Sequence, residues 1–132
     1  MSTTTKTYWQ QGQQFKSYHG SNEIQIDGTR EHGFGAKALV LSAIAACSGI
    51  DIVDILAKMK VNFSALEIDT ETEQTEEHPR VFKDIFVVYK VKTAPENEEK
   101  VRKAIELSLN KYCGVSAMLR KNSPIHFKLL IE

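Results

Sequence analysis

The chain has 132 residues, of which 42% are hydrophobic, and this is enough for one domain with an ordinary globular core. Lysine and arginine together number 17, as do aspartate and glutamate, so the formal net charge is zero. That balance gives no electrostatic reason to expect nucleic acid or an anionic membrane as a partner. We therefore expect a single domain over residues 1–132.

The N-terminal residues 1–14 are polar and contain no apolar segment of the kind found in signal peptides. The following residues to position 27 predict two or three short strands, because Glu23–Asp27 alternates polar and apolar side chains. Residues 28–35 contain three glycines and predict a loop.

Residues 36–60 predict a long helix that is apolar around most of its circumference, which is typical of a helix at the centre of a structure. Serine, glycine and aspartate interrupt its most apolar part, residues 38–55, and this favours a buried helix over a membrane span. We therefore expect a cytoplasmic protein, and in that compartment thiols are normally kept reduced.

The second half of the chain predicts a hairpin, a helical region and a last strand. Residues 63–77 and 81–93 alternate in hydrophobicity, and a charged turn with Pro79 separates them. An acidic first turn after Pro95 favours a helix, with Gly114 as its stop and a further short helix over residues 115–121. Residues 125–131 alternate as a strand. The order predicts an α+β fold of antiparallel strands packed around the buried central helix, without parallel βαβ units.

Cys47 and Cys113 are the only cysteines, and they are far apart in the sequence. Free cysteine often packs simply as a small buried hydrophobic side chain, so both residues also fit a structural role. A disulfide requires the fold to bring their Cα atoms within roughly 7 Å, and in a cytosolic protein such a pair is more often redox-active than structural. Asp51 shares a helix face with Cys47 and would disfavour its thiolate, so a reactive Cys47 would need a nearby cation.

The sequence indicates no metal site and no cofactor. Zinc sites usually have four ligands at short spacings, whereas the two cysteines and four histidines of this chain are scattered. Glycine-rich phosphate loops, serine-hydrolase elbows and H-E-x-x-H helices are also missing from the sequence.

Three segments together resemble the OsmC/Ohr superfamily, the osmotically inducible protein C and organic hydroperoxide resistance proteins of bacteria. They are ALVLSAIAACSGIDIVDIL at residues 38–56, HPRVF at residues 78–82 and AIELSLNKYCGVSAML at residues 104–119. The similarity covers essentially the whole chain, and it is nearest to the OsmC-like branch rather than to a typical hydroperoxide resistance protein.

The resemblance implies an intertwined α+β homodimer with two equivalent sites at the subunit interface. It further implies that Cys47 is the cysteine that attacks the peroxide and that Cys113 is the resolving cysteine. The substrate would be a small organic hydroperoxide, and the disulfide would be reduced by an external dithiol of the lipoyl type.

The sequence departs from the family pattern at a pair of charged residues. Active members have a glutamate nine or ten residues before the first cysteine, where this chain has Lys37 and Ala38. They also have an arginine from the N-terminal strands, for which Lys16 and Arg30 are only nearby basic residues. Without this Arg–Glu pair we expect weak activity from a thiol-dependent organic hydroperoxide reductase. The alternative is a non-catalytic dimer that binds a small apolar or electrophilic molecule at its interface.

Overall fold

The first part of the chain forms a small antiparallel sheet. The computed structural model describes residues 2–132 and divides at residue 40 into two units. The first unit contains β1 (Lys6–Gln11), β2 (Gln14–His19) and β3 (Asn22–Asp27), in the order β1-β2-β3. Gly12 and Gly20 occupy the two turns with φ of 52° and 62°, a conformation that favours glycine. The strands predicted before residue 28 are therefore confirmed.

The second unit contains helices and a three-stranded sheet. Helix α1 (Ala36–Lys58) begins in the first unit and continues into the second, where β4 (Ala65–Gln74) and β5 (Phe82–Lys92) form the predicted antiparallel hairpin. A 3-10 turn, η1 (Pro95–Asn97), leads into α2 (Glu98–Leu107). A π-helical turn, η2 (Ser108–Tyr112), precedes α3 (Gly114–Arg120), and β6 (Ile125–Ile131) ends the unit.

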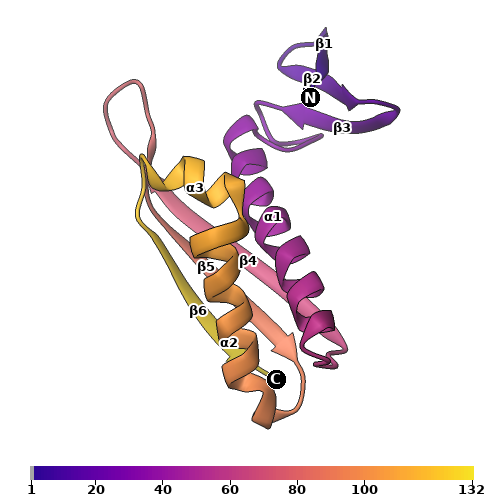
Figure 1. Ribbon diagram of the computed structural model, residues 1–132. Helices are drawn as coiled ribbons and strands as arrows, with labels where there is room; N and C mark the ends of the chain where they lie inside the picture. Colours follow the sequence, from indigo (N-terminus) through magenta and orange to yellow (C-terminus); the bar gives the residue numbers. More distant parts are fainter. Residues whose placement is uncertain (1) are drawn as a thin grey trace. The chain divides into compact units, whose positions relative to one another are not determined.

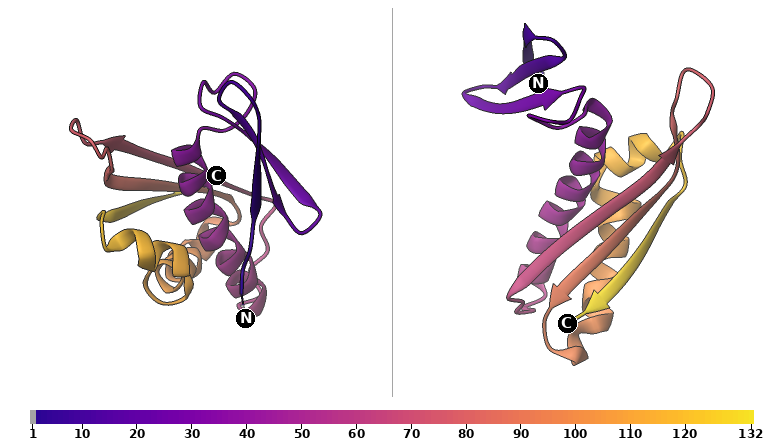
Figure 2. Two further views of the ribbon diagram at one scale, coloured as in Figure 1. Left: turned by 90° about the horizontal axis from the view of Figure 1, so that it is seen from above. Right: turned by 180° about the vertical axis from the view of Figure 1, so that it is seen from behind.

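Helices α1 and α2 lie side by side on one face of the sheet of β4, β5 and β6, as Figures 1 and 2 show. The core lies between the helices and the sheet, and it is formed by the side chains on the inner face of each element. Ile52 and Leu56 of α1 pack in one cluster with alternate residues of β5 and with the inner face of α2. This segregation of helices from strands confirms the predicted α+β class.

The prediction of antiparallel strands alone is wrong for one pair. Strand β6 pairs with β5 in parallel, with Ile85 opposite Ile125 and Tyr89 opposite Leu129. A parallel pair needs a crossover of a dozen or more residues, and the helical region over residues 95–120 provides it. The alternation of β6 in the sequence determines which side chains face the core but carries no information on strand direction.

Helix α1 is buried on one face rather than around its whole circumference. Ile44, Ser48, Ile52 and Leu56 are fully buried, whereas Ile50 and Val53 are 65% and 44% exposed. Within residues 2–132, α1 is also the one helix long and apolar enough to span a membrane. Its contacts with β5 and α2 identify it as a core helix of this fold.

Candidate active site

The two cysteines lie on different elements of the second unit. Cys47 is in the middle of α1 and is partly exposed, whereas Cys113 lies between η2 and α3 and is only 3% exposed. Both are free thiols, and Cys47 lies near enough to Cys113 to raise the pKa of the Cys113 thiol. The fold therefore brings together the two thiols that are far apart in the sequence.

The Cys113 thiol is held in its protonated form. Burial raises the pKa of Cys113, and the neighbouring Cys47 thiol raises it further, while hydrogen bonds from Ser116 act in the opposite direction. Since the thiolate is the nucleophilic form of cysteine, Cys113 is poorly suited to attack an external molecule in the resting protein. Of the pair, the partly exposed Cys47 is the one that a molecule from solution can reach first.

A change of helix type places Cys113. The chain leaves the α-helical pattern at Ser108, and the carbonyl oxygen of Ser108 accepts a hydrogen bond of 2.7 Å from the main-chain N–H of Cys113. Cys113 has an extended backbone and is the N-cap of α3, and its sulfur accepts a hydrogen bond of 3.3 Å from the Ser116 N–H. Gly114 is therefore the first residue of α3 and not a helix stop. Single π-helical turns are frequent at functional sites.

A chain of buried hydroxyl groups lies next to the cysteine pair. The Tyr89 hydroxyl and Ser48 Oγ are 2.7 Å apart, Ser48 Oγ and Ser108 Oγ are 3.1 Å apart, and Ser108 Oγ donates to Asp51 Oδ2 at 2.9 Å. Burial raises the pKa of Tyr89 to about 12, and the Cys113 thiol contributes to this rise. The expectation that Asp51 acts mainly on Cys47 therefore overlooked its hydrogen bond with Ser108.

Sequence reasoning did not identify Tyr89 and Ser108 as part of the site. In the sequence pattern, Tyr89 is one apolar position of an alternating strand, and Ser108 is one position on the inner face of a helix. The available signal was a serine on an otherwise apolar helix face, because a buried hydroxyl requires a hydrogen-bond partner. The same reasoning applies to Ser48 on α1, which is fully buried.

The basic residues Lys16, Arg30, Lys37 and Arg120 differ in their surroundings. The Arg120 guanidinium donates to the carbonyl oxygen of Leu109 at 2.7 Å, within the region that η2 distorts. In the first unit, Lys16 forms an ion pair of 3.6 Å with Glu23, and Arg30 lies in the loop with φ of 66°. Lys37 is exposed on the first turn of α1.

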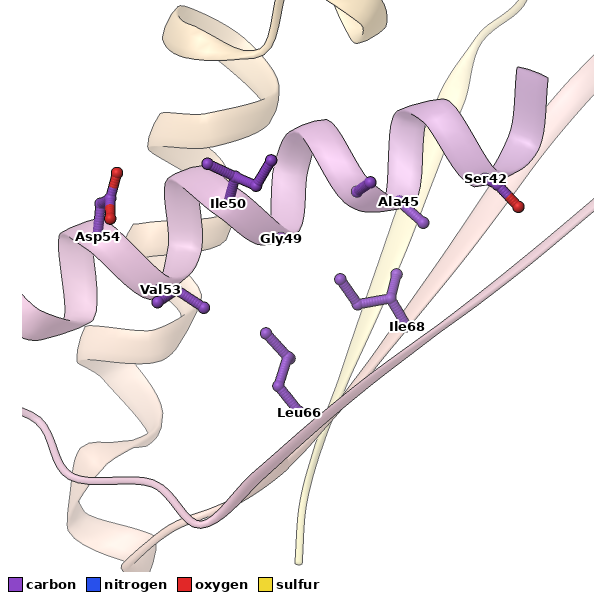
Figure 3. Close-up of a pocket in the computed structure, with 9 residues that line it drawn as sticks. Ser42, Ala45, Gly49, Ile50, Val53, Asp54, Leu66 and Ile68 are labelled. Carbon is purple, nitrogen blue, oxygen red and sulfur yellow. The ribbon is translucent and has the colours of Figure 1, made fainter. Parts of the chain in front are cut away.

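An apolar groove lies between α1 and β4 and has a volume of about 560 Å³. Figure 3 shows Ile50 and Val53 on the helix and Leu66 and Ile68 on the strand around this space. Ala46, the residue before Cys47, also lines it. Leu41 packs against the core and Ile44 is fully buried, so neither lines this groove.

Comparison with known proteins finds a matching family and a similar curated protein. The model of the family described as OsmC-like protein matches residues 27–128. Protein YhfA of Escherichia coli is 34% identical over 119 residues, which cover 86% of each chain.

Two solved structures illustrate the breadth of the structural similarity. A hypothetical protein from Aquifex aeolicus VF5 is 25% identical, with a TM-score of 0.86 over 100% of this chain and 98% of that one. An organic hydroperoxide resistance protein from Elizabethkingia anophelis has the same fold, with 10% identity and a TM-score of 0.75 over 100% and 97% of the two chains. The family match over residues 27–128 and the identity with YhfA show that the chain belongs to the OsmC-like protein family.

Proposed function

We propose that this protein reduces organic hydroperoxides with a redox-active cysteine pair, in which Cys47 attacks the peroxide and Cys113 resolves the product. The observation that carries the proposal is that the fold places the partly exposed Cys47 near the buried Cys113, close enough for Cys47 to raise the pKa of the Cys113 thiol. Membership of a family that includes hydroperoxide resistance proteins supports the choice of substrate.

The proposed reaction has two steps on the protein. The Cys47 thiolate attacks one oxygen of the O–O bond, so that an S–O bond forms, the alcohol leaves with a proton, and Cys47 becomes a sulfenic acid. The Cys113 sulfur then attacks the Cys47 sulfur and its proton leaves with the hydroxyl group as water, which gives a disulfide. An external dithiol reduces this disulfide by thiol exchange and is itself oxidised.

We further propose that the active form is a homodimer. Ile50 and Val53 are exposed apolar side chains on α1, and they border the apolar groove between α1 and β4. A second copy that covers this surface would gain roughly 25 cal/mol for each Å² of apolar area removed from water. Ile50 is three residues from Cys47 on the same helix face, so such an interface would surround the thiol with apolar groups.

This environment favours organic hydroperoxides over hydrogen peroxide as substrates. A bulky organic group gains free energy by leaving water for an apolar surface, and hydrogen peroxide has no such group. The cytoplasm, where thiols are kept reduced, is the compartment that we propose for the cycle, and a lipoyl-type dithiol is the proposed reductant.

The test is hydroperoxide consumption with dihydrolipoamide as the electron donor, for cumene hydroperoxide and for hydrogen peroxide. We expect faster consumption of cumene hydroperoxide, complete loss of activity in Cys47→Ser, and loss of turnover in Cys113→Ser. In Cys113→Ser, dimedone should trap one sulfenic acid on Cys47, whereas Cys47→Ser should give none. Equal rates for the two peroxides, or a Cys47→Ser variant as active as the wild type, would contradict the proposal.

A second candidate function is binding of a small apolar molecule without catalysis. The groove between α1 and β4 favours it, because its lining is largely apolar and contains neither thiol. A protein that consumes no hydroperoxide but binds an apolar fluorescent probe equally well with and without Cys47 would support this function.

A further inference from the structure

Ser108 is hydrogen-bonded to both segments that carry a cysteine. Its side chain reaches α1, where the hydroxyl donates to Asp51 Oδ2 at 2.9 Å and lies 3.1 Å from Ser48 Oγ. Its main-chain carbonyl accepts the 2.7 Å hydrogen bond from the Cys113 N–H that closes the π-helical turn. One residue therefore connects the helix of Cys47 to the backbone of Cys113.

The residues of α1 that the Ser108 side chain contacts lie close to Cys47 in the chain. Ser48 is the next residue in the chain, and Asp51 lies one turn further on the same helix face as Cys47. Ser48 and Ser108 are both fully buried, and the hydroxyl of Tyr89 lies 2.7 Å from Ser48 Oγ. A hydrogen bond to a carboxylate is stronger than one between neutral groups, and Asp51 therefore anchors Ser108 to this turn of α1.

We infer that Ser108 is a positioning residue that fixes the separation of the Cys47 and Cys113 sulfurs for disulfide formation. The inference rests on the proposed role of this pair, but it concerns the geometry of the pair and not the identity of the oxidant. In the resolving step the Cys113 sulfur must approach the Cys47 sulfur along one line, and small displacements slow such intramolecular reactions strongly. A flexible connection would leave the buried Cys113 thiol without a defined approach.

The experiment measures the effective concentration of the thiol pair. Wild type and variants are equilibrated with reduced and oxidised glutathione, quenched in acid, alkylated and analysed by mass spectrometry. For Ser108→Ala we expect the equilibrium constant for the Cys47–Cys113 disulfide to fall by about tenfold, because the two segments lose their common anchor. Asp51→Asn keeps an acceptor of the same size without its charge, and a smaller decrease is expected for it.

A matched control separates positioning from general stability. Ser123 is also a buried serine, 2% exposed, and its hydroxyl donates to the Phe82 carbonyl at 3.1 Å, away from both cysteine segments. Ser123→Ala should therefore leave the disulfide equilibrium within about twofold of the wild type. Dimedone trapping of Cys47 in Cys113→Ser, with and without Ser108→Ala, should give equal rates, because Ser108 acts on the second step only.

The outcomes distinguish this inference from the proposed function. Equal effects of Ser108→Ala and Ser123→Ala, or no effect of Ser108→Ala, overturn the positioning role. A wild-type protein that forms no disulfide between Cys47 and Cys113 with glutathione also overturns it. A wild type that forms the disulfide but consumes no hydroperoxide refutes the proposed reaction and leaves the positioning role intact. If Ser108→Ala does not fold, Asp51→Asn takes its place, and an unchanged disulfide equilibrium in that variant overturns the inference.

Discussion

Tyr89 of β5 and Ser48 of α1 share a hydrogen bond of 2.7 Å in the core, one residue away from Cys47. The tyrosine side chain is fully buried, and burial raises its pKa to about 12. The contact joins the sheet to the central helix at the level of the proposed active site. It also makes the ionisation of Tyr89 a probe of that region.

We predict that alkaline pH destabilises the protein through Tyr89. The phenol has a pKa of about 10 in the unfolded chain and about 12 in the folded protein, so its contribution is fully present below pH 10 and is lost as the pH rises toward 12. The loss over this window is on the order of 3 kcal/mol. Tyr89→Phe removes the ionisable group, so its free energy of unfolding should fall less steeply above pH 10.

Denaturant unfolding at a series of pH values checks this prediction, with absorbance at 295 nm as a second measurement. The wild type should show a tyrosine ionisation near pH 12 that Tyr89→Phe lacks. Tyr112→Phe, at an exposed tyrosine, is the control. A wild type and a Tyr89→Phe variant with identical pH dependence would contradict the burial argument.

We predict that Cys113 is alkylated slowly until the pH is above the pKa of a free cysteine thiol. Its pKa is raised chiefly by burial, and only the thiolate reacts with iodoacetamide. In a Cys47→Ser background, the rate of Cys113 alkylation should reach its midpoint at a pH above roughly 8.5, the value for a free cysteine. The same variant unfolded in urea is the matched control, because unfolding removes the burial. Equal midpoints in the folded and unfolded states would show that Cys113 is accessible.

Hydrophobic periodicity was sufficient to predict most of the fold. The residues that alternate in β4 and β5 are those that alternate between core and solvent, and the acidic turn after Pro95 does precede α2. Two features depend on interactions that periodicity does not describe. The direction of β6 follows from the path of the crossover, and the π-helical turn that begins at Ser108 includes a hydrogen bond from the Cys113 N–H to the Ser108 carbonyl.

For the site, the sequence named candidate residues but did not describe how they meet. Family resemblance implied the pair Cys47 and Cys113, and the fold places the two thiols near each other. The link through Ser108 and Asp51 was not predictable, because it depends on the rotation of α2 about its axis and on the register of α1. Neither can be read from a pattern of apolar residues in one helix.

We predict that Asp27 contributes to resistance against acid. Its carboxylate accepts hydrogen bonds from the Thr29 hydroxyl and N–H, at 2.8 and 2.9 Å, and from the His32 N–H at 3.1 Å. These bonds, those of Thr29 first, lower the pKa of Asp27 below its usual value. The resulting stabilisation is present above roughly pH 4 and is lost as the pH falls through the lower folded-state pKa.

Acid unfolding of Asp27→Asn, followed by circular dichroism, checks the contribution of this carboxylate. The variant should be less stable than the wild type at pH 7, and the difference should shrink as the pH falls below 4. Glu31→Gln removes an exposed carboxylate from the same loop and should follow the wild-type curve closely. A constant difference between Asp27→Asn and wild type from pH 7 to pH 2 would rule out a role for the carboxylate charge.

The exposed apolar face of α1 predicts the effect of a single charge on assembly. Ile50 and Val53 are 65% and 44% exposed, so aspartate at either position should leave the folded subunit intact. If a second copy covers this face, Ile50→Asp places a carboxylate in an apolar interface, where it costs several kcal/mol. We expect the dimer dissociation constant to rise by about a hundredfold or more, in line with that cost.

Sedimentation velocity over a range of protein concentrations measures this shift. Lys103→Asp is the control, because it also introduces an aspartate at an exposed helical position but lies on α2. Thermal unfolding of each variant verifies that the subunit is folded. If Ile50→Asp and Lys103→Asp sediment alike as dimers, the interface lies on another surface. If the wild type is already a monomer at micromolar concentration, the groove between α1 and β4 is open to solvent, and the proposed homodimer is refuted.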